Sequence, residues 1–254
     1  MNDTARGLHV VIMLCRRELV RIVRQPARLA AAIGTPALLW LLIGSGLAEA
    51  VKPEHLGEIS YSGFLLPGMM SLVVVFASVF SSISLIEQRQ SGWIQSVLVA
   101  PTPRWSLALG TIIGGSVVAW LQAAVLALIL PFLDTSITAT GLIGSLIALA
   151  LTALAMTGLG LALAWRAETT TGFHAVMNLL LMPMWLLSGA FFPASAASTW
   201  IASLIRINPL TWCNEAIRNP LAGESAWTGL LVAAVFAVLA FVAATVIIAR
   251  PFKR

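Results

Sequence analysis

The chain has very little charge. Only 10% of its 254 residues are Asp, Glu, Lys or Arg, whereas 59% are hydrophobic. A soluble domain has about 25% charged and about 45–50% apolar residues. This composition excludes an ordinary soluble protein and predicts a membrane protein. Because a helix needs about 20 apolar residues to cross about 30 Å of hydrocarbon, the chain has room for at most about seven crossings.

Lysine is almost missing, since Lys52 and Lys253 are the only two. Neither follows a glycine-rich turn, and the sequence has no GxxxxGK[ST] motif. The chain is therefore predicted not to be an enzyme that hydrolyses ATP by itself. Ionisable residues are also missing from the middle of the apolar runs. Their absence argues against a transporter driven by protons or sodium, which needs such groups at mid-membrane.

No pattern predicts an intramembrane hydrolase. Ser188-Gly189 lacks the surrounding GxSG motif, and Gly44-Ser45-Gly46 has no histidine partner. We therefore expect no catalytic residue in this chain.

Metal binding is not expected either. His174, Met177, Met182 and Met184 could bind copper or haem iron, but methionines at helical spacing usually pack in the core. The two cysteines, Cys15 and Cys213, are predicted to lie on opposite sides of the bilayer and to form no disulfide.

Six apolar runs predict an all-α membrane protein with six transmembrane helices. Charged and turn residues bound these runs, at 29–49, 64–86, 106–132, 141–164, 174–193 and 227–249. Pro36 and Pro183 fall inside two of them and are expected to kink the helices. Residues 1–28 are then a cytoplasmic N-terminus, 29–249 the transmembrane domain and 250–254 a cytoplasmic tail.

The orientation follows from the basic residues, which prefer the cytoplasmic side. With the N-terminus inside, the outer segments contain only Lys52, Arg206 and Arg218. All the other basic residues are inside: Arg6, Arg16, Arg17, Arg21, Arg24, Arg28, Arg89, Arg104, Arg166, Arg250, Lys253 and Arg254. Both termini are therefore predicted to be cytoplasmic, in the cell (inner) membrane. The net charge of +5 is attributed to this membrane face and not to a nucleic-acid surface.

Residues 8–25, LHVVIMLCRRELVRIVRQ, resemble a basic amphipathic helix that ends at Pro26. Its predicted apolar face consists of Leu8, Val11, Ile12, Leu19, Ile22 and Val23. We expect it to lie in the inner interface of the membrane. It is either an electrostatic anchor on lipid or a docking element for a cytoplasmic partner.

The segment between the fifth and sixth runs is predicted to form two short helices, at 198–207 and 209–218. Asn208 is expected to cap the second helix, with Pro209 in its first turn. Both suit a re-entrant or interfacial position on the outer side. Within the second helix, Glu215 and Arg218 have the spacing of an i,i+3 pair.

The segment IEQRQSGWIQSVLVAPTPRW, residues 86–105, links the second and third runs on the cytoplasmic side. A short helix there would present Trp93, Ile94, Val97 and Leu98, which are apolar anchors of the kind that dominate interfaces. Alternatively, these residues lie on the lipid headgroups as an aromatic belt. The segment RAETTTG, residues 166–172, is a shorter second candidate for a cytoplasmic contact.

Four ordered motifs resemble those of the type-2 ABC export permeases. They are LLPG at 65–68, the spacing of Glu87, Gly92 and Pro101, SGAFFP at 188–193, and NPLTW with AIR at 208–218. Trp212 stands where the family usually has tyrosine, and a proline is missing from residues 195–199, which affects the expected shape of the outer helices.

The resemblance implies a subunit that pairs with a second copy of itself and binds two copies of a cytosolic ABC ATPase. ATP and Mg would bind to that ATPase, and membrane lipids would surround the permease. The segment after the second span would form a coupling helix on the ATPase. The residues expected to couple are Glu87, Arg89, Gly92, Trp93, Ile94, Val97, Leu98 and Pro101.

Weakly polar residues on the second and fifth runs are candidates for a substrate pathway between two copies. They are Ser71, Ser78, Ser81, Ser82, Asn178 and Trp185. Serines in membrane helices also often bond to their own backbone, which is the alternative here. An apolar lining favours export of amphiphilic, drug-like or lipid-linked molecules. The competing function is an ATP-independent transporter or channel.

Overall fold

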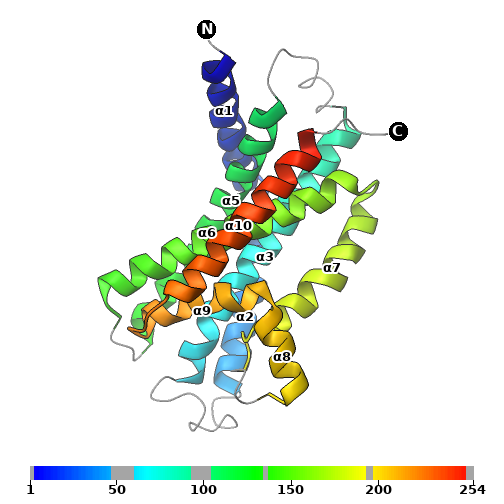
Figure 1. Ribbon diagram of the computed structural model, residues 1–254. Coiled ribbons are helices and arrows are strands. Elements are labelled where there is room, and N and C mark those ends of the chain that lie inside the picture. Colours follow the sequence, from blue (N-terminus) through cyan, green and yellow to red (C-terminus); the bar gives the residue numbers. More distant parts are fainter. Residues whose placement is uncertain (1–2, 47–59, 93–103, 134–136, 193–196, 250–254) are drawn as a thin grey trace.

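The computed structural model describes residues 3–46, 60–92, 104–133, 137–192 and 197–249 (Figure 1). Within these residues every regular element is a helix, which confirms the predicted all-α class. The elements are α1 (Asp3–Val23), α2 (Pro26–Gly46), α3 (Tyr61–Gln90), α5 (Arg104–Leu126), η2 (Ala127–Phe132), α6 (Ala139–Arg166), α7 (Thr170–Leu186), α8 (Thr199–Ile207), α9 (Pro209–Leu221) and α10 (Trp227–Ala249).

Three of the helices begin at a hydroxyl cap. Ser60, Thr138 and Thr169 each accept a hydrogen bond from the backbone N–H of the glycine three residues later, at 3.1–3.2 Å. Such caps satisfy one of the free N–H groups of the first turn and so define where the helix begins.

Five helices in the described residues are long and apolar enough to cross a membrane. They are α2, α3, α5 continued by η2, α6 and α10. These correspond to five of the six predicted spans. α3 has 30 residues and is therefore about 45 Å long, more than the thickness of the hydrocarbon layer.

The helix of the fifth predicted span, at 174–193, ends earlier than expected. α7 has only 17 residues, or about 25 Å, and it ends at Leu186. Gly189 then takes a positive φ of 70°, which turns the chain. Asn208 and Asn214 donate hydrogen bonds to the carbonyls of Leu187 and Ser188, so these residues bond to α9 instead of continuing the helix.

α3 lies at the centre of the fold. In an apolar stretch of 18 residues of α3, 89% of the residues are buried inside the protein. The corresponding shares are 17% for α2 and 28% for α10. α3 packs against α2, α5, α6, α7 and α9. The outward faces of α2 and α10 remain for lipid or another chain, whereas α3 has almost no surface left for either.

Small residues allow the helices to approach closely. A Cβ on Gly158 of α6 would lie 3.0 Å from the backbone of Ala240 on α10. A Cβ on Gly160 would lie 2.4 Å from Ser82 Oγ of α3. The close contacts of α6 with α10 and with α3 therefore depend on glycine at these two positions.

α1 packs along α5 and does not stand apart from the bundle. Val11 and Leu14 are buried at this contact. A Cβ on Gly110 would lie 2.8 Å from Leu14 Cδ1, so α5 needs glycine there. The predicted apolar face is divided, because Val11 faces α5 whereas Leu8 and Ile12 are each 58% exposed. In Figure 1, α1 and the end of α10 lie at one end of the molecule, and α8 and α9 lie toward the other.

The two short helices predicted between the fifth and sixth runs are present as α8 and α9. Asn208 caps α9 by accepting a hydrogen bond from the Leu210 N–H at 3.0 Å, and Pro209 is the first residue of the helix, as predicted. α9 is three residues longer than expected, since it continues through Pro220 to Leu221.

Candidate functional site

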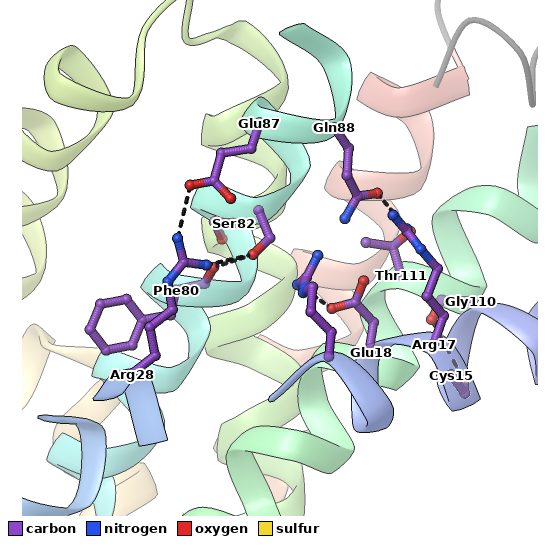
Figure 2. A network of polar contacts seen from close by, with 12 residues as sticks. Cys15, Arg17, Glu18, Arg28, Phe80, Ser82, Glu87, Gln88, Gly110 and Thr111 are labelled. Atoms are coloured by element: carbon purple, nitrogen blue, oxygen red, sulfur yellow. Dashed lines mark hydrogen bonds and ion pairs between the residues drawn. The ribbon is translucent and has the colours of Figure 1, made fainter. Parts of the chain in front are cut away.

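The last turn of α3 carries a row of polar side chains that bond to other elements. We define the α3 anchor cluster as Arg17, Arg28, Glu87, Gln88, Arg89 and Gln90. Figure 2 shows part of it, with Arg28 beside Glu87 and Arg17 beside Gln88. The segment predicted to contact a partner follows this turn directly.

Arg28 of α2 connects the two helices with two bonds. Its Nη2 lies 2.8 Å from Glu87 Oε1, and its Nη1 donates to Ser84 Oγ at 3.2 Å. An exposed ion pair alone contributes at most about 1 kcal/mol. Here the second bond to Ser84 fixes the direction of the guanidinium, so the pair specifies the position of α2 against α3.

Arg17 of α1 binds the neighbouring residue of α3. Its Nη1 donates to Gln88 Oε1 at 2.8 Å (Figure 2). Glu87 and Gln88 therefore connect the end of α3 to two different helices.

Arg89 bonds to the end of α6. Its Nη1 donates to the Trp165 carbonyl at 2.7 Å, and its Nη2 donates to the Ala167 carbonyl. Gln90 Nε2 donates to the Glu168 carbonyl at 3.0 Å. The Trp165 and Ala167 carbonyls lie at the C-terminal end of α6, where carbonyls lack partners within the helix, and Glu168 follows directly. Arg89 therefore caps α6 and joins it to α3.

α3 ends with a glycine turn. The Ser91 N–H donates to the Glu87 carbonyl at 2.9 Å, and Gly92 has a positive φ of 77°. This left-handed conformation is a common helix ending and favours glycine. Gly92 therefore sets the direction in which the chain leaves the anchor cluster. The predicted anchors Trp93, Ile94, Val97, Leu98 and Pro101 lie outside the described residues.

The structure thus places Glu87, Arg89 and Gly92 at the base of the predicted coupling segment. Sequence reasoning missed Arg17, Arg28, Gln88 and Gln90. The two arginines had been counted only as part of the basic membrane face. Their pairing with α3 spans 71 and 59 positions along the chain, which local patterns do not encode.

The second candidate segment, 166–172, lines a surface groove between α6 and α7. The groove has a volume of about 470 Å³ and is also lined by Leu163, Phe173 and Val176. It is adjacent to the carbonyls that Arg89 and Gln90 bind. The groove therefore lies next to the last turn of α3, from which the predicted coupling segment begins.

The predicted pathway serines are buried in α3, and three of them bond to their own helix. Ser71, Ser78 and Ser82 donate to the carbonyls of Gly68, Val75 and Ser78, at 2.7–2.8 Å. This is the alternative considered for serines in membrane helices. In the described residues only Ser81 of this group has a hydroxyl without a partner.

The other two predicted pathway residues, Trp185 and Asn178, have different surroundings. Trp185 is buried and donates through Nε1 to the Gly68 carbonyl at 2.9 Å, the same oxygen that Ser71 binds. Asn178 is exposed on α7. Asn178 therefore lies on the surface while the other five residues lie in the interior, and the pathway stays a prediction.

A second set of polar side chains holds α9 against the turn after α7. Asn214 Nδ2 donates to Ser188 Oγ at 2.7 Å, and Arg218 Nη2 donates to the Gly189 carbonyl at 3.0 Å. The Arg218 guanidinium carbon also lies 3.8 Å from the centre of the Phe64 ring, a cation–π geometry. Arg218 therefore contacts both α3 and the turn after α7. The i,i+3 spacing of Glu215 and Arg218 allows a pair, and the charges of the two residues interact.

In the part of the chain that the structure describes, no three His, Cys, Asp or Glu side chains are close enough together to hold a metal ion. His174 is exposed, whereas Met177 is buried in the core.

Glu18 of α1 is a buried acid at the edge of the anchor cluster. It is 6% exposed and pairs with Arg21. Burial raises its pKa above the usual 4.5, although the charges of Arg21 and Arg17 and a hydrogen bond with Gln88 act in the opposite direction. The net upward shift means that the folded state binds a proton at Glu18 more tightly than the unfolded state does.

We therefore expect the contribution of Glu18 to stability to be complete below pH 4.5 and to be lost as the pH rises through the higher folded pKa. Thermal unfolding of purified wild type and Glu18→Gln across this range tests the sign. The Tm of wild type should fall relative to that of the variant as the pH rises. A constant difference between the two would contradict the prediction.

Comparison with known proteins gives a consistent picture. The ABC-2 type transporter family model matches residues 9–221. The chain is 28% identical to a putative transport permease, ycf38, of Cyanophora paradoxa, over 85% of this chain and 75% of that protein. It is 25% identical to nodulation protein J of Neorhizobium galegae, over 78% and 76%. It is 24% identical to the probable multidrug ABC transporter permease YbhR of Escherichia coli K12, over 60% of this chain and 42% of that protein.

Proposed function

Because the chain belongs to the ABC-2 type transporter family, we propose that it is the permease subunit of an exporter that uses ATP hydrolysed by a separate ABC ATPase. Membership in this family makes the chain a membrane transport subunit and implies partnership with an ABC ATPase. The outward direction of transport and the coupling to ATP hydrolysis are the proposal.

The α3 anchor cluster is the observation that supports coupling most directly. Arg17, Arg28 and Arg89 bond the last turn of α3 to α1, to α2 and to the end of α6. A displacement of the segment that follows would therefore act on several helices at once. Such a rigid base is what a permease without its own motor needs in order to receive force from a partner.

The proposed complex contains two copies of this permease and two copies of the ATPase, and ATP and Mg bind to the ATPase. In the proposed topology both termini are cytoplasmic and the chain lies in the inner membrane. α7 provides a sixth crossing together with the turn that follows it, and α8 and α9 lie on the outer side. α1 lies at the inner interface in contact with membrane lipids.

The proposed substrate is an amphiphilic, drug-like or lipid-linked molecule. The candidate pathway on α3 contains serines and no charged side chain, which suits weakly polar molecules better than ions. One similar protein is named a probable multidrug permease and another a nodulation protein. These names describe those proteins, and they are compatible with an organic substrate here.

Coupling is tested in vesicles that contain the permease and its ATPase. Replacing Trp93 by Ala or Leu98 by Asp removes a proposed apolar anchor, and a central interface anchor often contributes about 2 kcal/mol or more. We therefore expect transport per ATP hydrolysed to fall at least tenfold, with normal membrane insertion. Trp227→Ala is the matched control, because Trp227 is 76% exposed at the start of α10. Transport that continues without any ATPase would instead identify an ATP-independent transporter or channel.

A further inference from the structure

A small cavity lies between α1, α2, α3 and α5. Its wall includes Glu18 and Arg21 of α1, Ser81 of α3, and Gly115 and Gln122 of α5. The Glu18 carboxylate, seen near the centre of Figure 2, pairs with Arg21 at this wall. Ser81 is the one predicted pathway residue in this wall, and the other five are not part of it.

Two side chains of the wall carry polar atoms without a partner. Ser81 Oγ and both amide atoms of Gln122 are sealed from solvent and make no hydrogen bond. Ser81 is 7% exposed and Gln122 is 4% exposed. Buried polar atoms nearly always bond to the protein or to ordered water. These three atoms therefore call for an occupant that both donates and accepts hydrogen bonds.

The size of the cavity decides which occupant fits. The space open to the centre of a water-sized sphere is about 20 Å³. One water molecule needs about 10–15 Å³ by the same measure and usually makes about three hydrogen bonds. A phosphate group or a sugar is too large for this space. A metal cation is disfavoured because the guanidinium groups of Arg21 and Arg28 face the same cavity.

We propose that this cavity is a binding site for one structural water molecule, held by the Ser81 hydroxyl and the Gln122 amide. The water accepts from Gln122 Nε2, donates to Gln122 Oε1 and exchanges a hydrogen bond with Ser81. It satisfies the unpaired atoms that the protein leaves on α3 and α5. The water therefore bridges these two side chains of α3 and α5, in addition to the direct packing of the two helices.

Gly115 keeps this site open. A Cβ at Gly115 would lie 2.4 Å from Ser81 Oγ and 2.8 Å from Thr157 Cγ2. Any larger residue would displace the Ser81 hydroxyl from the wall of the cavity. On another side the Glu18–Arg21 pair covers the cavity, so α1 limits the exchange of the water with its surroundings.

Gln122→Met tests the proposal, because methionine has nearly the same size and no amide. If water is bound, the variant loses two of the water's partners, and its Tm should fall by about 2–4 °C. If the cavity is dry, the variant removes two unpaired polar atoms, and its Tm should stay the same or rise. The second result would overturn the proposal. Leu121→Met, on the exposed side of the same helix, is the control and should leave the Tm unchanged.

Radiolytic hydroxyl labelling of the full-length protein provides an independent measurement. Val118 lines the cavity and is 8% exposed. Radicals formed from a bound water should oxidise Val118 in wild type, and this oxidation should decrease severalfold in Gln122→Met. Equal labelling of Val118 in both proteins would contradict a water held by the amide.

Discussion

Gly68→Val should prevent the chain from reaching a stable fold. A Cβ at Gly68 would lie 2.7 Å from Ala190 Cβ and 2.9 Å from Ala190 Cα. The second contact is with the backbone, so no side-chain rotation relieves it. Overpacking in a core costs about 1–3 kcal/mol and sometimes more. Here the added branches would also disturb the Gly68 carbonyl, which accepts hydrogen bonds from Ser71 and Trp185.

We expect a loss of about 3 kcal/mol or more in stability, which is a large share of the total for a typical protein. The yield of monodisperse protein in detergent and its Tm measure the effect. Gly34→Val is the matched control, because nothing lies within 4 Å of a Cβ at Gly34. If both variants behaved like wild type, the close contact between α3 and Ala190 would be wrong.

Arg89→Met should separate ATP hydrolysis from transport. The variant removes the hydrogen bonds to the Trp165 and Ala167 carbonyls and so weakens the link between the end of α3 and α6, where Gln90 still binds the Glu168 carbonyl. A hydrogen bond to a charged group contributes about 1.5–3 kcal/mol. Transport per ATP hydrolysed is expected to fall about tenfold or more in vesicles that contain the ATPase.

Two comparisons separate coupling from general damage. Arg24→Met, which changes an exposed arginine in the turn between α1 and α2, should leave coupling intact. Arg89→Lys should restore only part of it, since lysine lacks the planar fork that reaches two carbonyls. If Arg89→Met transported as efficiently as wild type, the link between α3 and α6 would have no role in coupling.

The helices themselves could be predicted from the sequence because hydrophobic length and turn residues are local signals. Asn208 and Pro209, for example, identified the start of α9 directly. The end of α7 was placed too late for a physical reason. Residues 187–192 are apolar enough to continue a span, but the Asn208 and Asn214 amides bind the Leu187 and Ser188 carbonyls from a distant part of the chain.

Only some residues of the candidate site could be predicted from the sequence. Glu87 and Arg89 were found because they are charged residues next to a conspicuous segment. Their partners were not found, since the sequence around an arginine such as Arg28 looks the same whether it faces lipid or a carboxylate, and a backbone carbonyl such as that of Trp165 carries no sequence signal. Glu18 was not singled out by any sequence pattern. Its burial follows from the packing of α1 on Gly110 and Gly114 of α5, a contact between segments about 95 residues apart.

The central position of α3 has a consequence for how the protein is made. The ribosome releases helices in sequence order, yet α3 is covered largely by α5 and α6, which are synthesised after it. After insertion α3 is therefore exposed to lipid until the later helices pack against it. During this time its serine hydroxyls can donate hydrogen bonds to backbone carbonyls of the same helix. The hydrogen bonds of Ser71, Ser78 and Ser82 within α3 avoid the cost of exposing unpaired hydroxyl groups to lipid.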